Sequence, residues 1–189
     1  MLVIDTSVLL NLLGSCRPQF ILSHTPFDVV VPRAVLHEIK YEPMVEKETD
    51  ANLDKLIGSG SLKVAEPDGK VDAIALSLTG LPSPDDLDDG EAYAIAQAVT
   101  MNAKLAIDER KGRRVIEREF PGLICLFTLD VIEQATLRAN LSEADLAEII
   151  YASLRWARMR VPSERRDWVI SLIGKTRARD CPSLGYIFL

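Results

Sequence analysis

Short apolar runs alternate with segments of helical spacing along the first two thirds of the chain. Each run is too brief for a helix and shows no polar alternation, which is typical of a strand buried on both faces. The runs occupy residues 2–4, 28–31, 62–65, 104–107 and 122–127. Strands of this kind, separated by helices, predict a parallel sheet with right-handed crossovers and therefore an α/β fold.

Amphipathic spacing predicts the helices between these runs. Thr6 and Ser7 can cap a first helix, and Pro32 can open a second one that continues through Ile39. Segment 71–78 fits either a short helix or a strand. Further helices are expected over residues 46–57, 92–99 and 109–119.

The last third of the sequence is predicted to be helical. Helices are expected over residues 128–138, from a capping box at residues 142–145 to about residue 159, and from Pro162 to Ile173. We therefore expect residues 1–140 to form one domain and residues 141–189 to form a helical extension packed on the same domain.

Two aspartates follow apolar runs in the same way. Asp5 ends the first run and Asp108 ends the fourth, each just before a predicted helix. The carboxyl ends of parallel strands share one edge of the sheet, where ligands bind in open α/β folds. If the first and fourth strands are neighbours, Asp5 and Asp108 face one another. Alone, Asp5 could equally be a helix cap or a loop acid.

Two glutamates lie near the starts of helices that follow strands. Glu38 shares a helix flank with apolar Val35, although a glutamate there is also consistent with an ordinary solvated side chain. Glu91 follows Asp88 by three residues, which is the spacing of a capping box in which Glu91 folds back on the helix start. A cap, a solvated side chain or a capping box can explain each acid alone. None of them explains why four acids occur in comparable settings.

Converging carboxylates need a proton or a cation. Two of them about 5 Å apart, at an effective dielectric constant near 20, repel by roughly 3 kcal/mol. Mg²⁺ or Mn²⁺ accepts oxygen ligands and can deprotonate a water for attack on a phosphodiester. The four acids therefore predict metal-assisted phosphodiester hydrolysis.

Composition limits the class of protein. A chain of 189 residues with 48% hydrophobic residues can build one well-packed domain. No apolar stretch approaches the roughly 20 residues of a membrane span, and no signal-peptide pattern begins the sequence, so we expect a cytoplasmic protein with no membrane contact. The three cysteines are widely spaced, which predicts neither a disulfide framework nor a zinc site.

Charge is unevenly distributed. The net charge of −6 argues against coating of nucleic acid by bulk electrostatics. Residues 155–179, however, hold eight Lys or Arg against two acids, a local net charge of +6. This basic segment could contact phosphates or an acidic partner, or could be a solvated helix face.

The acidic segments resemble the PIN-domain family of metal-dependent ribonucleases over residues 1–127. The order and spacing of four segments carry the resemblance: VIDTSVL (3–9), VPRAVLHEI (31–39), DGEA (89–92) with its alanine-rich continuation, and LAIDER (105–110). The resemblance implies a three-layer fold with a central parallel sheet in the order 3-2-1-4-5, which would make Asp5 and Asp108 face one another.

The resemblance also implies site residues and partners. Asp5, Glu38, Glu91 and Asp108 take the places of the family's catalytic and metal-binding acids, with Thr6 as the neighbouring hydroxyl. Many relatives have an aspartate where this chain has Glu91, so Asp88 or Asp89 could compete for that role. Mg²⁺ or Mn²⁺ is the implied cofactor and RNA the implied substrate. Because many small PIN proteins are toxins restrained by an antitoxin and form homodimers, an antitoxin and a second copy of the chain are candidate partners.

Basic residues follow Asp108 and could hold the phosphates of a substrate strand, although a solvated helix is equally consistent with them. They are Arg110, Lys111, Arg113 and Arg114, and Arg110 is the substrate-binding candidate.

Other functions fit the residues less well. Haloacid-dehalogenase phosphatases need a second aspartate two residues after the first, where this chain has Ser7. Neither of the glycine-rich phosphate-binding motifs, G-x-G-x-x-G or G-x-x-x-x-G-K-[ST], occurs in the sequence. The remaining alternative is a catalytically silent PIN-like module that acts by binding.

Overall fold

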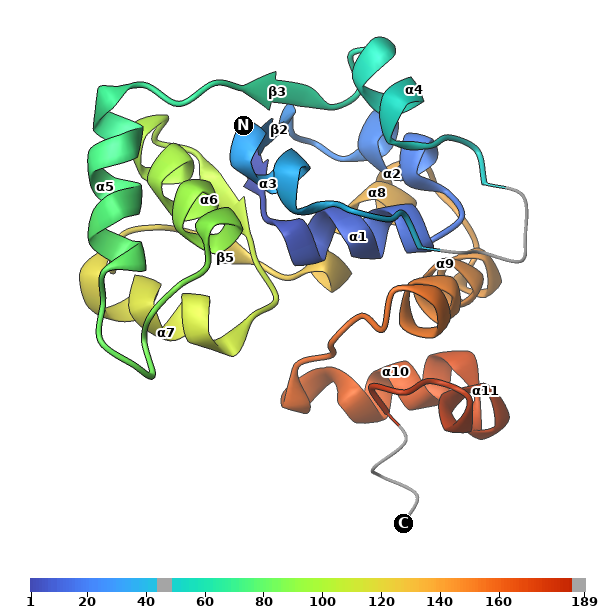
Figure 1. Cartoon of the computed structure of the whole chain (residues 1–189). Helices are drawn as coiled ribbons and strands as arrows, with labels where there is room; N and C mark the ends of the chain where they lie inside the picture. The colour runs from blue at the N-terminus through green and yellow to red at the C-terminus, as the bar shows by residue number, and fades with distance from the viewer. Residues whose placement is uncertain (44–48, 185–189) are drawn as a thin grey trace.

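A single parallel sheet forms the centre of the molecule. The computed structural model describes residues 1–43 and 49–184 (Figure 1). Within these ranges the strand order is β3-β2-β1-β4-β5, and helices flank the sheet. The strands are β1 (Leu2–Ile4), β2 (Val29–Pro32), β3 (Lys63–Ala65), β4 (Lys104–Ala106) and β5 (Cys125–Leu126). The expected α/β fold and strand order are confirmed.

Helices occupy most of the remaining described chain. In order they are α1 (Thr6–Gly14), α2 (Pro18–His24), α3 (Arg33–Glu38), α4 (Leu53–Gly58), α5 (Gly69–Thr79), α6 (Asp89–Thr100), α7 (Arg110–Glu119), α8 (Thr128–Arg138), α9 (Glu143–Trp156), the 3₁₀ turn Ser163–Arg165, α10 (Arg166–Ile173) and α11 (Lys175–Arg179). No helix in the described ranges is long and apolar enough to span a membrane.

Some boundaries differ from the expected ones for local reasons. The helix expected over 46–57 begins at Leu53, because Asn52 caps it by accepting a hydrogen bond from the Lys55 amide at 3.0 Å. The first residues of that expected helix, 46–48, lie outside the described ones. The ambiguous segment 71–78 is helical as part of α5, capped by Asp68.

The central strands are buried on both faces, as the uninterrupted apolar runs predict. All three residues of β1 have no exposed surface, and β1 pairs with β2 on one side and β4 on the other. Helix α6 packs against β1, β2 and β4, and its alanines allow a close approach. This packing sets the N-terminus of α6 beside the strand ends.

The C-terminal helices share the same apolar core. Ile149, Ile150 and Leu154 of α9 are buried in one cluster with β1, and α9 packs against α1. In Figure 1, α10 and α11 lie below α9 at the lower right, and the α9–α10 connection extends toward α7.

Candidate active site

The carboxyl ends of β1 and β4 bring Asp5 and Asp108 to one edge of the sheet. Ile4 pairs with Ala106 in the parallel register, and the Asp5 amide donates to the Ala106 carbonyl at 3.2 Å. Asp5, which directly follows β1, therefore lies beside the segment that connects β4 to Asp108. Both side chains are buried, with 1% and 5% of their surface exposed.

Asp5 has a second role as the cap of α1. Its Oδ1 accepts from the Val8 amide at 2.8 Å, and the Ser7 hydroxyl lies 3.0 Å from both carboxylate oxygens. The prediction that Thr6 and Ser7 cap this helix is wrong, because Asp5 is the N-cap and both hydroxyl residues lie in the first turn. The cap fixes the Asp5 carboxylate at the strand–helix junction.

Asp108 is held by two residues that the sequence analysis did not single out. Its Oδ1 accepts from the Thr128 amide at 2.9 Å, and its Oδ2 accepts from the Thr128 hydroxyl at 2.6 Å and from the Asn11 side chain at 2.7 Å. Asn11 was detectable as the one polar position in the run Leu9–Leu13. Its burial is explained by this bond.

Glu38 joins the starts of α1 and α6. Its Oε1 accepts from the Gly90 amide at 2.6 Å, and its Oε2 accepts from the Thr6 hydroxyl. A Cβ atom added at Gly90 would lie 2.1 Å from Glu38 Oε2, so only glycine allows this approach. Glu38 thus contacts the sequence neighbours of Asp5 and Glu91.

Glu91 is buried, and its carboxylate accepts no hydrogen bond from the part of the chain that the structure describes. Asp88 caps α6 by accepting from the Glu91 amide at 2.9 Å, but the Glu91 side chain does not fold back to complete a capping box. Within the described residues neither Glu91 carboxylate oxygen accepts a hydrogen bond, and the Lys111 ammonium lies 3.5 Å from Oε2. Asp88 and Asp89, the competing acids, are exposed, whereas Glu91 is 4% exposed.

Burial raises the proton affinity of the three buried acids, and in Asp5 the charges of the other two add to it. Burial raises the pKa of Asp5 well above its ordinary value, and the charges of Asp108 and then Glu91 raise it further. Burial also raises the pKa of Asp108, although its bonds to Thr128 and Asn11 act in the opposite direction. The pKa of Glu91 is raised by burial and then by the charge of Asp88. This edge of the sheet therefore favours positive charge.

The donor chemistry fits a hard divalent cation. All four acids offer carboxylate oxygens, and the two buried Glu91 oxygens accept no hydrogen bond from the described residues, although Oε2 is ion-paired with Lys111. Across residues 1–43 and 49–184, no three Asp, Glu, His or Cys side chains are already arranged as a group that could hold a metal ion. Binding of an ion would therefore draw these carboxylates together.

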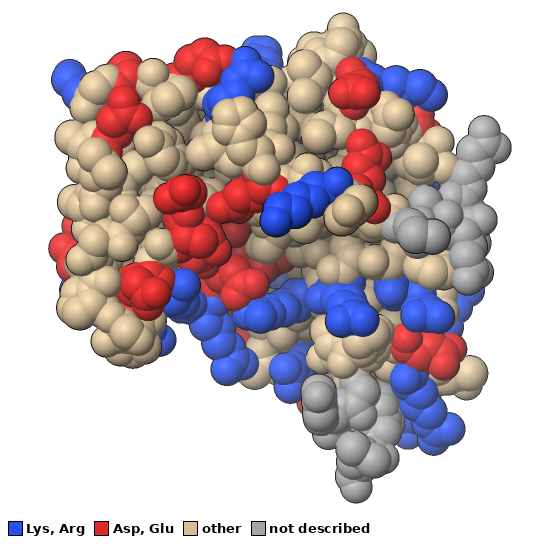
Figure 2. All heavy atoms as spheres, in the orientation of Figure 1, with Lys and Arg blue, Asp and Glu red and all other residues tan. Residues whose placement is uncertain are grey.

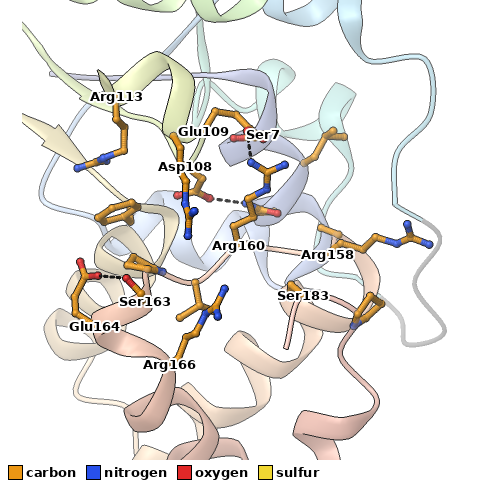
Figure 3. Close-up of a pocket in the computed structure, with 18 of the residues that line it drawn as sticks. Ser7, Asp108, Glu109, Arg113, Arg158, Arg160, Ser163, Glu164, Arg166 and Ser183 are labelled. Atoms are coloured by element: carbon orange, nitrogen blue, oxygen red, sulfur yellow. Dashed lines mark hydrogen bonds and ion pairs between the residues drawn. The ribbon is translucent and has the colours of Figure 1, made fainter. Parts of the chain in front are cut away.

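A basic groove adjoins the acids. It has a volume of about 1100 Å³, and Ser7, Asn11 and Asp108 line its inner end. Figure 2 shows acidic side chains gathered in a hollow of this face, with Lys and Arg side chains in a row beside it. In Figure 3, Asp108 and Arg166 lie on opposite sides of the groove. We call this pocket the arginine groove, after six of its lining residues, Arg110, Arg113, Arg114, Arg158, Arg160 and Arg166.

Sequence comparison assigns the family. A family model described as a PIN domain matches residues 1–175, which is most of the chain. The chain belongs to the PIN-domain family. PIN domains are generally nucleases and typically use divalent metals. Searches of curated proteins and of solved structures found no match. The match extends beyond the four segments of residues 1–127 and includes most of the C-terminal helices of this PIN domain.

Proposed function

We propose that this protein is a metal-dependent ribonuclease that hydrolyses RNA phosphodiesters at the edge formed by β1 and β4. The observation that carries the proposal is the set of buried acids there, Asp5, Glu91 and Asp108, of which the Glu91 carboxylate accepts no hydrogen bond from the described residues. Buried carboxylates in mutual repulsion are retained where a bound cation offsets their charge.

Asp5, Glu38, Glu91 and Asp108 would hold a Mg²⁺ or Mn²⁺ ion. When bound, such an ion lowers the pKa of a water and stabilises the charge that develops during phosphodiester cleavage. The protein's own residues fix the ligands: Asn11 and Thr128 orient the Asp108 carboxylate. Ser7 and the Val8 amide orient Asp5, and Thr6 orients Glu38. These bonds limit the rearrangement needed on metal binding.

The proposal predicts that Asp5→Asn abolishes most cleavage of a labelled single-stranded RNA in the presence of Mn²⁺. Asparagine keeps the oxygen that caps α1 but removes the negative charge, so the rate should fall by about 10²-fold or more. The measurement is the initial rate of RNA cleavage, with and without EDTA.

Asp68→Asn is the matched control, because Asp68 is also the N-cap of a helix, α5, but is exposed and accepts from the Lys70 and Val71 amides. Its rate should equal that of the wild type. Equal rates for Asp5→Asn and the wild type would reject the mechanism, and absence of cleavage with any divalent metal would favour a silent binding module.

A further inference from the structure

The arginines of the groove come from two parts of the chain that are distant in sequence. One wall is the start of α7, just after Asp108, and the other is the α9–α10 connection, residues 157–165, with the first residue of α10. Arg160 of the connection forms an ion pair with Glu109, which directly follows Asp108. The C-terminal wall is therefore tied to the proposed catalytic edge, and Figure 3 shows it facing Asp108.

Half of the groove's arginines already have partners. Besides the Arg160–Glu109 pair, Arg114 forms an ion pair with Asp85. Arg113 stacks on the Phe127 ring at 3.7 Å and donates to two backbone carbonyls. These three side chains mainly support the groove's shape.

The other three arginines lack a counter-charge. Across the described ranges, Arg110, Arg158 and Arg166 form no ion pair and no side-chain hydrogen bond. The Nε atom of Arg166 is buried and has no acceptor among those residues. A buried guanidinium nitrogen without an acceptor, such as the Arg166 Nε atom, is costly unless an anion binds beside it. Arg110 and Arg158 are exposed, so their charges are hydrated and available to an anionic ligand.

Arg158 occupies a position that usually holds glycine. It follows the end of α9 with a φ of 57°, in the left-handed region that side chains rarely adopt. Met159, the next residue, is fully buried and anchors the turn. The turn thus places an exposed, unpaired arginine at the groove at a cost in backbone energy.

We propose that the arginine groove binds the sugar–phosphate backbone of single-stranded RNA, with Arg158 and Arg166 as its phosphate contacts on the C-terminal wall. This inference rests on the proposed nuclease function, because the groove leads from these arginines directly to Asp108. Among the described residues that line the groove, Phe127 is the one aromatic side chain, and Arg113 covers its ring. Binding is therefore through phosphates and tolerant of base sequence.

The test measures affinity for a dye-labelled oligouridylate by fluorescence anisotropy, in EDTA so that the strand stays intact, over a range of salt concentrations. Arg158→Gly and Arg166→Gln together should raise Kd by roughly tenfold or more and reduce the salt slope by about 1.4, since each phosphate contact on a single strand contributes about 0.7. Arg158→Gly alone should weaken binding while leaving the melting temperature equal or higher, because glycine favours this φ. If Arg158 only supported the fold, its replacement would not weaken RNA binding while the melting temperature stayed equal or rose.

Arg138→Gln is the control, because Arg138 is exposed at the end of α8 and does not line the groove. It should leave Kd and salt slope unchanged. Unchanged values for the groove variants would overturn the inference even if the wild type cleaves RNA with Mn²⁺. Equal affinity for an RNA duplex, or for polyglutamate at the same salt concentration, would also overturn it. A groove effect on binding without any cleavage would reject the nuclease function and leave the groove assignment standing.

Discussion

Asp5 combines two roles with opposite effects on stability. Its carboxylate caps α1, but burial and the nearby Asp108 charge raise its pKa above the ordinary value for an aspartate. The folded protein therefore binds this proton more tightly than the unfolded chain does. In the absence of metal, the stabilising contribution of the protonated form is fully present below the ordinary pKa of Asp5 and is lost as pH rises through the raised pKa.

We predict that Asp5→Asn stabilises the metal-free protein at neutral pH. Asparagine keeps the cap and removes the buried charge, so the melting temperature in EDTA should rise, and its decline with increasing pH should become shallower. Adding Mn²⁺ should raise the melting temperature of the wild type more than that of the variant. Thermal unfolding at several pH values checks this. A lower melting temperature for the variant in EDTA would contradict it.

The positions of the acids could be predicted from the sequence, but the residues that hydrogen-bond to them could not. Asp5 and Asp108 were predictable at one edge because each ends an apolar run, and a parallel sheet collects such ends. The bonds of Asp108 to Asn11 and Thr128 span 97 and 20 residues of sequence, and no local pattern encodes that pairing. The sequence also did not show that the Glu91 carboxylate accepts no hydrogen bond from the described residues. The spacing of Asp88 and Glu91 predicts a capping box, and that box does not form.

At the scale of elements, the glycine at the start of α6 sets the position of Glu38. An added Cβ at Gly90 would lie 2.5 Å from Thr6 Oγ1 as well as 2.1 Å from Glu38 Oε2. Both contacts are with side-chain ends, which can move without unfolding the helix.

We therefore predict that Gly90→Ala lowers cleavage by about tenfold or more while changing the free energy of unfolding by less than about 1 kcal/mol, because alanine favours the helix. RNA cleavage and urea unfolding are the two measurements. Gly69→Ala is the matched control, since Gly69 also begins a helix but has no atom within 4 Å of an added Cβ. Loss of activity in both variants would show that the Glu38 contact is not the cause.

Element boundaries were less predictable than element order. The five strands follow from apolar runs that a doubly covered sheet can bury, whereas their order in the sheet was implied by the resemblance to the PIN-domain family. Helix α2 (Pro18–His24) was not expected, because seven residues with two inward apolar side chains give little periodicity. The expected strand over 122–127 forms only at Cys125–Leu126, since pairing with β4 at this edge of the sheet is short.

For the molecule as a whole, the contact between α1 and α9 joins the sheet edge that holds Asp5 and Asp108 to the C-terminal helices. The Ser153 hydroxyl donates to the Asn11 carbonyl at 3.0 Å. Gly14 ends α1 against Ala157, where an added Cβ would lie 2.7 Å from the Ala157 Cβ and 3.1 Å from its backbone nitrogen. The Ala157 backbone cannot move away from an added Cβ without also moving the wall of the arginine groove, which Ala157 lines.

Gly14→Ala is predicted to destabilise the protein by about 1–3 kcal/mol through overpacking, despite the helix preference of alanine. Chemical denaturation measures this. Gly58→Ala serves as the comparison, because Gly58 also ends a helix but has open space around it, and it should be neutral or slightly stabilising. A Gly14→Ala protein as stable as Gly58→Ala would mean that α9 is not packed tightly on α1.

The double role of Asp5 has a consequence for how relatives of this chain should be compared. A descendant that lost catalysis would still be under selection for a capping side chain at position 5, so an aspartate retained there is weak evidence of turnover. Glu91 caps nothing, and its oxygens accept no hydrogen bond from the described residues. Drift at position 91 would therefore separate pseudoenzymes from working nucleases more reliably than drift at position 5.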